Sequence, residues 1–264
     1  MPEPLRSDRA SVLESLTEQL RALEENRWVG SGEVISTLSP ALDRLLPAGG
    51  FRRGALVEWL SSGSASGAAT LALLSARGAL AAGGALVVID RRRLFYPPAA
   101  ARLGIALEKI VVVRPASQAD HAWALDQALR SRGVAAVWCS LEKQDNRTLR
   151  RLQLAAETSG VVGLLLRPQH ARHEPSWAEL RLWVEPIARS QSLAGRSRLL
   201  RVELLRSRAG PAGGAVELEI PALEEAPRTQ NDPAGWRGTN HETRPVYLAS
   251  QLAAATTRRR SRRA

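Results

Sequence analysis

The sequence predicts an α/β fold with a mostly parallel central sheet and antiparallel strands at its C-terminal edge. Short apolar runs alternate with helical patterns over residues 34–222, which is typical of parallel strands joined by crossover helices. The last apolar segments of this range alternate Leu, Val and Ile with Arg and Glu, as antiparallel strands do. The chain has 264 residues, 44% of them hydrophobic, which is enough for one sizeable core. We therefore expect a core over 34–222, an N-terminal helical arm over 1–33 and a flexible basic tail over 223–264.

The N-terminal arm is expected to hold one amphipathic helix over residues 8–25. Apolar residues recur there at helical spacing, and charged residues occupy the other faces. The apolar stripe consists of Val12, Leu13, Leu16, Leu20 and Leu23. Its four leucines, Leu13, Leu16, Leu20 and Leu23, suit docking on a neighbouring subunit or another protein; a helix folded back on its own core is the alternative.

The core elements follow from the order of apolar runs and turn signals. Ser39 before Pro40 indicates the start of a short helix, and Gly49-Gly50 indicates a turn before the first core strand. The pattern predicts strands near 55–60, 85–90, 109–114, 134–140 and 161–166. It predicts helices between them near 68–83, 97–103, 117–132 and 145–159. Antiparallel strands are expected over 178–187, 199–206 and 214–220, with a hairpin loop between the last two.

The stretch from Val57 to Leu73 has the layout of a phosphate-binding loop without its chemistry. A strand leads through a Ser/Gly turn into a helix of small residues, but Ala68 and Ala69 replace the Lys and the Ser/Thr of such a loop. Weak anion binding at Gly67 is the remaining functional prediction, because a helix N-terminus offers N–H groups and a favourable dipole. The candidate nucleotide-loop residues are Ser62, Gly63, Ser64, Ser66, Gly67, Ala68, Ala69 and Thr70.

The net charge of +11 would attract polyanions, and nucleic acid is a common partner of basic surfaces. Five arginines lie in the last seven residues, so much of the excess charge belongs to the tail. A second cluster, Arg91–Arg93, is either a solvated turn or a patch that binds phosphates. The chain has only two lysines, and a coding bias toward Arg and Ala explains that as well as any function does. The candidate DNA contacts are Arg91, Arg92, Arg93, Arg258, Arg259, Arg260, Arg262 and Arg263.

Other residue patterns argue against several classes of protein. Cys139 is the single cysteine and has no disulfide partner within the chain, and no secretory leader is evident, so we expect a cytoplasmic protein. No apolar run approaches the roughly 18–20 residues that cross a bilayer, so no membrane partner is expected. His170 and His173 lack further ligands nearby, so we expect solvated histidines and no metal site. No cofactor is expected.

Aromatic residues and the cysteine are expected mostly in the core. Cys139 reads as a buried strand residue with no reactive role. Core packing is the simplest reading of four tryptophans on predicted strands or helices: Trp59, Trp123, Trp138 and Trp183. Trp28 and Trp236 lie outside the regular core and are candidates for interface contacts.

The segment Ile35–Gly54 resembles the one that precedes the phosphate loop in the RecA-like recombinase family. Its Ser-Thr, Leu-Asp and Gly-Gly-x-x-x-Gly elements occur in the family's order, and the resemblance extends over residues 30–190. It implies a RecA-like P-loop core. It also places Cys139 where the family has a metal-binding Asp, and Arg92 where it has a water-activating Glu. The resemblance therefore implies a degenerate, non-catalytic site, which we describe as a pseudo-ATPase.

Later segments resemble the ImuA family, RecA-like accessory proteins of bacterial mutagenesis cassettes. These segments are Leu149–Glu157, Gly163–Pro168, Pro175–Leu182 and Leu200–Arg206. The resemblance implies an adaptor in the SOS-type DNA damage response that supports translesion synthesis. Its implied partners are an ImuB-like polymerase homologue, RecA and an error-prone DnaE-type polymerase complex, with self-association through the N-terminal helix. A working RecA-type ATPase or recombinase with an altered loop and a SulA-type division inhibitor are the alternatives.

Overall fold

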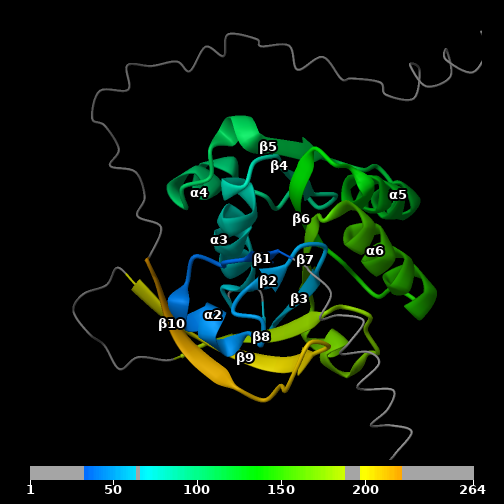
Figure 1. The fold of residues 1–264 in the computed structure, drawn as a ribbon. Helices are drawn as coiled ribbons and strands as arrows, with labels where there is room; N and C mark the ends of the chain where they lie inside the picture. Colours follow the sequence, from blue (N-terminus) through cyan, green and yellow to red (C-terminus); the bar gives the residue numbers. More distant parts are fainter. Residues whose placement is uncertain (1–32, 64–65, 188–196, 222–264) are drawn as a thin grey trace, which may run out of the picture. The chain divides into compact units, whose positions relative to one another are not determined.

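The structure is a computed structural model that describes residues 33–63, 66–187 and 197–221 (Figure 1). The strands of its main sheet are β3 (Leu56–Ser61), β4 (Ala85–Ile89), β5 (Ile110–Val113), β6 (Val134–Ser140), β7 (Val162–Arg167), β8 (Leu180–Pro186), β9 (Ser197–Ser207) and β10 (Ala215–Pro221). These eight strands lie in the order β10-β9-β8-β3-β7-β6-β4-β5. All pairs from β8 to β5 are parallel, whereas β9 and β10 are antiparallel to their neighbours. The predicted fold class is confirmed.

One of the three C-terminal segments joins the sheet differently from the expectation of a purely antiparallel edge. β8 pairs in parallel with β3, with Val57 opposite Leu180, and it is antiparallel only to β9. The reason is the connection, because the chain leaves β7, passes through a short 3-10 helix, η2 (Gln169–His173), and enters β8 on the other side of β3. Such a crossover leaves the two strands it joins parallel.

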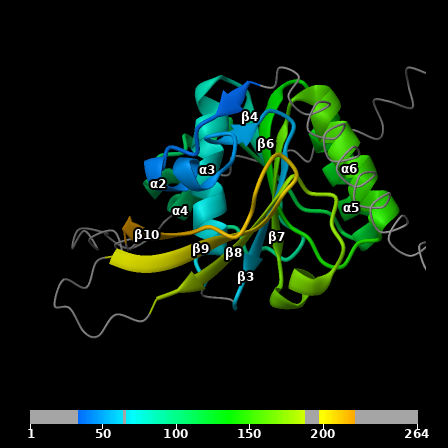
Figure 2. The ribbon, with the colours of Figure 1, turned by 60° about the horizontal axis from the view of Figure 1, so that its bottom comes forward.

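Helices cover both faces of the sheet (Figure 2). One face packs against α2 (Pro40–Leu45), α3 (Ala68–Ala81) and α4 (Pro97–Arg102), and the other against α5 (Gln118–Arg130) and α6 (Asn146–Ser159). A 3-10 helix, η1 (Leu107–Lys109), precedes β5. Side-chain caps explain the helix starts, since Ser39, Ser117 and Asp145 accept hydrogen bonds from amides of the first turns of α2, α5 and α6. None of the helices in the described residues is long and apolar enough to cross a membrane.

A small two-stranded ribbon precedes the main sheet and was not predicted. Gly49-Gly50 leads into β2 (Phe51–Arg52), which pairs antiparallel with β1 (Val34–Ile35), and the first strand of the main sheet starts only at Leu56. The ribbon needs a glycine, because a Cβ on Gly50 would lie 2.5 Å from the Ile35 carbonyl oxygen.

The tryptophan predictions are confirmed at three positions and wrong at one. Trp59, Trp138 and Trp183 are buried, but Trp123 is 60% exposed. Helix α5 buries the face that carries Leu125 and Leu129, and Trp123 lies outside that face. The position of Trp123 on the helix therefore leaves it exposed, although its side chain is apolar. Cys139 is fully buried, as predicted.

A buried ionic network, also not predicted, ties three central strands to η2. Glu58 of β3 is fully buried and accepts a hydrogen bond from Arg181 Nε of β8 at 2.8 Å. Arg167 Nε of β7 lies 3.5 Å from the other Glu58 oxygen, and Arg167 Nη2 donates to Glu174 at 2.6 Å. Arg181 also donates to the carbonyl of Ala171 in η2. The network holds the connection between β7 and β8 against the sheet.

Candidate functional site

The turn between β3 and α3 is the candidate site. Gly67 is the N-cap of α3 in the left-handed conformation, with φ 86° and no side-chain cap. Ser62 and Gly63 follow β3, while Ser64 lies outside the described residues, as do Leu13, Leu16, Leu20 and Leu23 of the arm and the arginines at 258–263. The strand before the turn and the helix after it are therefore both present, as expected from the sequence.

Part of the hydrogen-bonding capacity of this turn is already used within it. The Ser66 amide donates to the Gly63 carbonyl at 3.2 Å, and the Ala68 amide donates to Ser66 Oγ at 3.3 Å. Ser66 is buried, and Ala69 is exposed in the first turn of α3. Two amides that could face a bound phosphate thus have partners inside the turn.

Apolar packing also closes the turn from the side of β9. A Cβ on Gly67 would overlap Leu200 Cδ1 and lie 3.1 Å from Leu200 Cδ2. Ala68, at the lysine position of a phosphate loop, is 3% exposed and belongs to the main hydrophobic cluster with Leu200. A side chain longer than that of Ala68 would have to displace this cluster.

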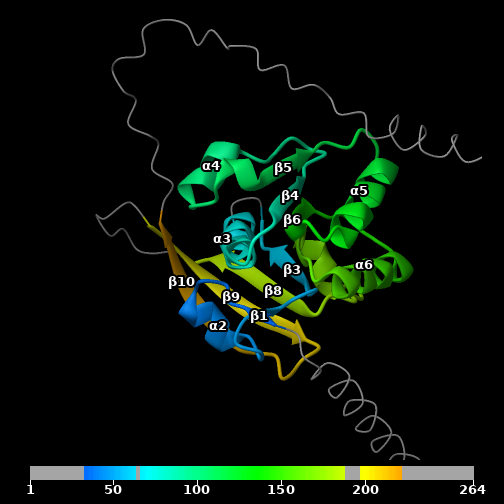
Figure 3. The ribbon, with the colours of Figure 1, turned by 45° about the horizontal axis from the view of Figure 1, so that its top comes forward.

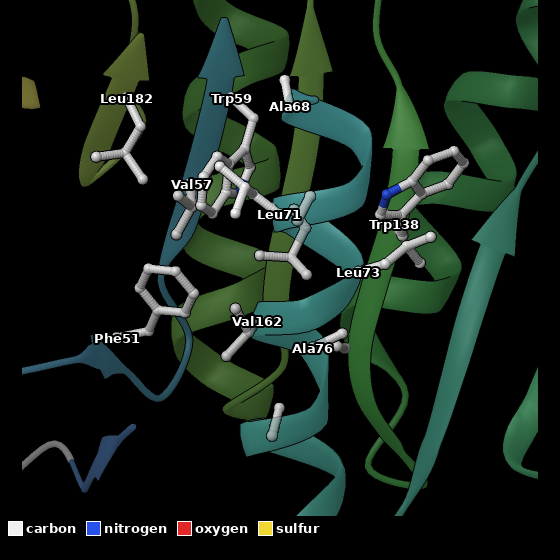
Figure 4. Close-up of a cluster of buried hydrophobic side chains, with 14 of the residues drawn as sticks. Phe51, Val57, Trp59, Ala68, Leu71, Leu73, Ala76, Trp138, Val162 and Leu182 are labelled. Carbon is white, nitrogen blue, oxygen red and sulfur yellow. The ribbon is translucent and has the colours of Figure 1, made fainter. Parts of the chain in front are cut away.

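Strand β6 places an aromatic ring against α3. Trp138 of β6 packs in the same cluster as α3 (Figure 4). Its Nε1 donates to the Ala69 carbonyl at 3.4 Å. Its ring centroid lies 5.7 Å from that of Phe95. Cys139 packs in the second cluster with α5 and α6, and burial raises the pKa of its thiol to about 12. The side chain of β6 that packs against α3 is therefore Trp138, whereas Cys139, which the resemblance aligns with a metal-binding Asp, lies in the cluster on the other face of the sheet.

The segment after β4 holds the other position that the sequence singled out. Arg92 is exposed and forms an ion pair with Glu142 at 3.1 Å, across the carboxyl ends of β4 and β6. The Asp90 carboxylate accepts hydrogen bonds from the amides of Leu94 and Phe95 at 2.8 and 3.0 Å. Asp90 thus stabilises the backbone of its own turn.

The described residues do not fit a magnesium-bound nucleotide at this turn. A phosphate loop needs a lysine for the phosphates, a hydroxyl for the metal and a carboxylate nearby. The turn has Ala68 and Ala69 at the first two positions, and Trp138 of β6 packs against the first turn of α3, where oxygen ligands would be needed.

The two histidines of η2 are exposed and belong to no cluster of metal ligands among the described residues. His170 is exposed, with Nε2 4.0 Å from Glu174, and His173 is exposed at the end of the same helix. The described part of the chain contains no group of three or more His, Cys, Asp or Glu residues placed to hold a metal ion.

Sequence reasoning missed the residues that close the turn: Phe95, Trp138 and Leu200. One signal was available for Trp138, because alternation along β6 puts it on the face opposite Val137 and Cys139. Leu200 gave no local signal, since it comes from a strand more than a hundred residues away along the chain.

Comparisons with known proteins agree with this fold. The family model of the RecA N-terminal domain matches residues 18–139. The crystal structure of the RadB recombinase superposes with a TM-score of 0.53 at 20% identity, covering 69% of this chain and 94% of that one. ImuA proteins from two Caulobacter vibrioides strains, NA1000 / CB15N and ATCC 19089 / CIP 103742 / CB 15, are each 29% identical over 164 residues. The chain has the RecA-like fold and is homologous to ImuA. The ImuA match covers 59% of this chain and 62% of each relative, so it spans less than two thirds of the relatives' length.

Proposed function

We propose that the chain is a non-catalytic RecA-like adaptor that supports mutagenic translesion synthesis in the SOS-type DNA damage response. Its work is to hold other proteins together, and it turns over no nucleotide. The expected partners are an ImuB-like polymerase homologue, RecA and an error-prone DnaE-type polymerase complex. Similarity to ImuA supports the pathway and the partners.

The packing at the turn into α3 is the observation that carries the non-catalytic part of the proposal. Leu200 covers Gly67, Ala68 lies in the hydrophobic cluster, and Trp138 bonds to the first turn of the helix. These contacts give the turn a structural purpose, because it joins the central strand to the helix that packs on it. A fold can persist after its original chemistry has gone.

The N-terminal arm is the proposed contact surface for partners. Its stripe of Leu13, Leu16, Leu20 and Leu23 precedes the described residues, and an amphipathic helix of this kind binds apolar grooves. Deleting residues 1–26 should abolish self-association or partner capture while the circular dichroism and thermal midpoint of the core stay unchanged. If light scattering gives the same complex masses for the deletion variant and the full chain, the arm is not the contact surface.

Two assays on the full chain test the adaptor role. Co-expression with the ImuB-like protein, RecA and the DnaE-type polymerase of the same cell should give a complex by size-exclusion chromatography. A strain without the gene should lose damage-induced mutation and regain it with the wild-type chain or with Thr70→Ala, a loop hydroxyl variant. Phosphate release from ATP in the presence of single-stranded DNA, above that of a no-protein control, would contradict the non-catalytic role.

A further inference from the structure

Four arginines lie at the carboxyl ends of two neighbouring parallel strands. Arg91–Arg93 follow β4 after one residue, Arg114 follows β5 directly, and all four are exposed. Ile89 is opposite Val113 in the ladder, and the Asp90 amide donates to the Val113 carbonyl at 2.8 Å. The two strands lie side by side at the edge of the sheet, between α4 and α5 (Figure 3). They therefore bring all four cations to one place, although Arg114 is far from the others in sequence.

Carboxylates balance this charge only in part. Arg92 pairs with Glu142 at 3.1 Å, with both side chains at least half exposed. The other three arginines form no ion pair within the described part of the chain. Asp90 is engaged by two backbone amides, and Asp120 by the Ser117 amide and hydroxyl at the start of α5. The edge keeps a net positive charge that is open to solvent.

The turn after β4 also exposes the aromatic ring of Tyr96, and hydrogen bonds to Asp90 hold the backbone of this turn in place. Asp90 holds the amides of Leu94 and Phe95, and Phe95 is buried against Trp138 with ring centroids 5.7 Å apart. The residues on either side of this anchor point outward, with Leu94 69% and Tyr96 63% exposed. Tyr96 is also the N-cap of α4, where prolines occupy the first turn. The ring is thus presented beside the arginines by a turn that needs little ordering on binding.

We propose that Arg91–Arg93, Arg114 and Tyr96 form a binding surface for single-stranded nucleic acid. The guanidinium groups contact phosphates, and the phenol ring stacks on an exposed base. An open row of cations beside an exposed ring matches a flexible polyanion with free base faces. A duplex offers the phosphates but keeps its base faces stacked, so Tyr96 favours the single strand. This surface does not depend on the adaptor role, and it would serve that role by placing the chain on a gapped template.

Salt titration of the full chain with a fluorescein-labelled oligothymidylate tests the arginines. Replacing Arg91, Arg93 and Arg114 together with Gln should reduce the slope of log Kd against log salt by about 2, because each phosphate contact contributes about 0.7. The matched control replaces Arg44, Arg132 and Arg147 with Gln, three arginines that are also exposed and without ion pairs in the described part. It makes the same change in net charge, so long-range attraction and the basic tail affect both variants equally. Equal slopes in the two variants would overturn the proposal.

Tyr96 is tested by variants that keep the charge. Tyr96→Ala should weaken oligothymidylate binding about 5-fold to 100-fold with an unchanged salt slope, because stacking on one base is lost. Tyr96→Phe should bind like the wild type, and both variants should bind a duplex of the same length equally well. Unfolding midpoints within a degree of the wild type confirm that each variant folds. The proposal fails if Tyr96→Ala binds oligothymidylate as tightly as the wild type and a polyglutamate peptide of the same charge displaces the oligonucleotide from the protein. The surface would then belong to acidic protein segments.

Discussion

Glu58 and Arg181 form an ion pair with 2.8 Å between Oε2 and Nε, and both lie inside the sheet on adjacent parallel strands. Arg167 approaches the same carboxylate at 3.5 Å from the strand on the other side. A buried charge is tolerated only when it is paired and hydrogen-bonded. The three side chains therefore depend on one another, and the connection that carries η2 depends on them.

Replacing Glu58 by Leu should lower the free energy of unfolding by about 3–5 kcal/mol, because two buried arginines lose their shared carboxylate. Urea denaturation of the full chain measures this change. The control is Glu33→Gln, which breaks the exposed pair of Glu33 with Arg53 at 2.6 Å and should change stability by no more than about 1 kcal/mol. Equal effects at the two positions would show that the buried network contributes nothing specific.

Gly67 and Leu200 should be coupled in stability. Gly67→Ala introduces a Cβ at a positive φ and against Leu200, whereas Leu200→Ala removes a buried side chain and should cost about 2–5 kcal/mol. The double variant should lose less than the sum of the two by more than about 0.5 kcal/mol, since the space left by Leu200 accepts the new methyl group. A double-mutant cycle by urea denaturation measures the coupling. Strict additivity would mean that the two residues are not in contact.

Restoring the lysine of a phosphate loop should damage the protein without creating an ATPase. Ala68→Lys places a long charged side chain in the hydrophobic cluster, and overpacking alone should cost about 1–3 kcal/mol. Ala69→Lys changes the exposed neighbour and should stay within about 0.5 kcal/mol of the wild type. Thermal melts compare the stabilities, and phosphate release measures activity. ATP hydrolysis by an Ala68→Lys protein that is as stable as the wild type would show that the turn has room for the lysine and a nucleotide.

The centre of the main sheet could be predicted because its strands β3, β4, β6 and β7 are mostly buried and appear in the sequence as apolar runs between helical patterns. β3 shows this clearly, with five of its six residues buried. The ribbon of β1 and β2 escaped prediction, since strands of two residues carry no periodic signal. The exposure of Trp123 was predicted wrongly because the prediction rested on the residue type and did not consider which face of the helix carries Trp123.

The candidate site could be predicted only in outline. The absence of Lys and Ser/Thr at 68 and 69 was visible in the sequence, but the contact of Gly67 with Leu200 joins segments that only the folded sheet brings together. The same holds for Arg114, which joins Arg91–Arg93 through the pairing of β4 with β5. Long-range pairing decides such contacts, and local patterns do not encode it.

Glu179 should make stability depend on pH near neutrality. It is almost completely buried, and burial raises the pKa of its carboxyl from 4.5 to about 7, outweighing the Arg52 guanidinium 3.9 Å away. The folded chain therefore holds this proton more tightly than the unfolded chain. The free energy of unfolding should fall as pH rises from 4.5 to about 7, by on the order of 3 kcal/mol in total, and then level off.

Glu179→Gln should remove this fall, because the amide stays neutral at every pH in the window. His121 acts in the opposite direction, since burial and then the charge of Arg91 lower its pKa, and its protonation destabilises the fold on the acid side. That contribution is common to the wild type and the variant, so the difference between them isolates Glu179. Urea midpoints measured in steps from about pH 5 to 8 should converge at low pH and separate, with the variant more stable, at high pH. Parallel curves would mean that the Glu179 carboxyl is already ionised in the folded protein throughout this range.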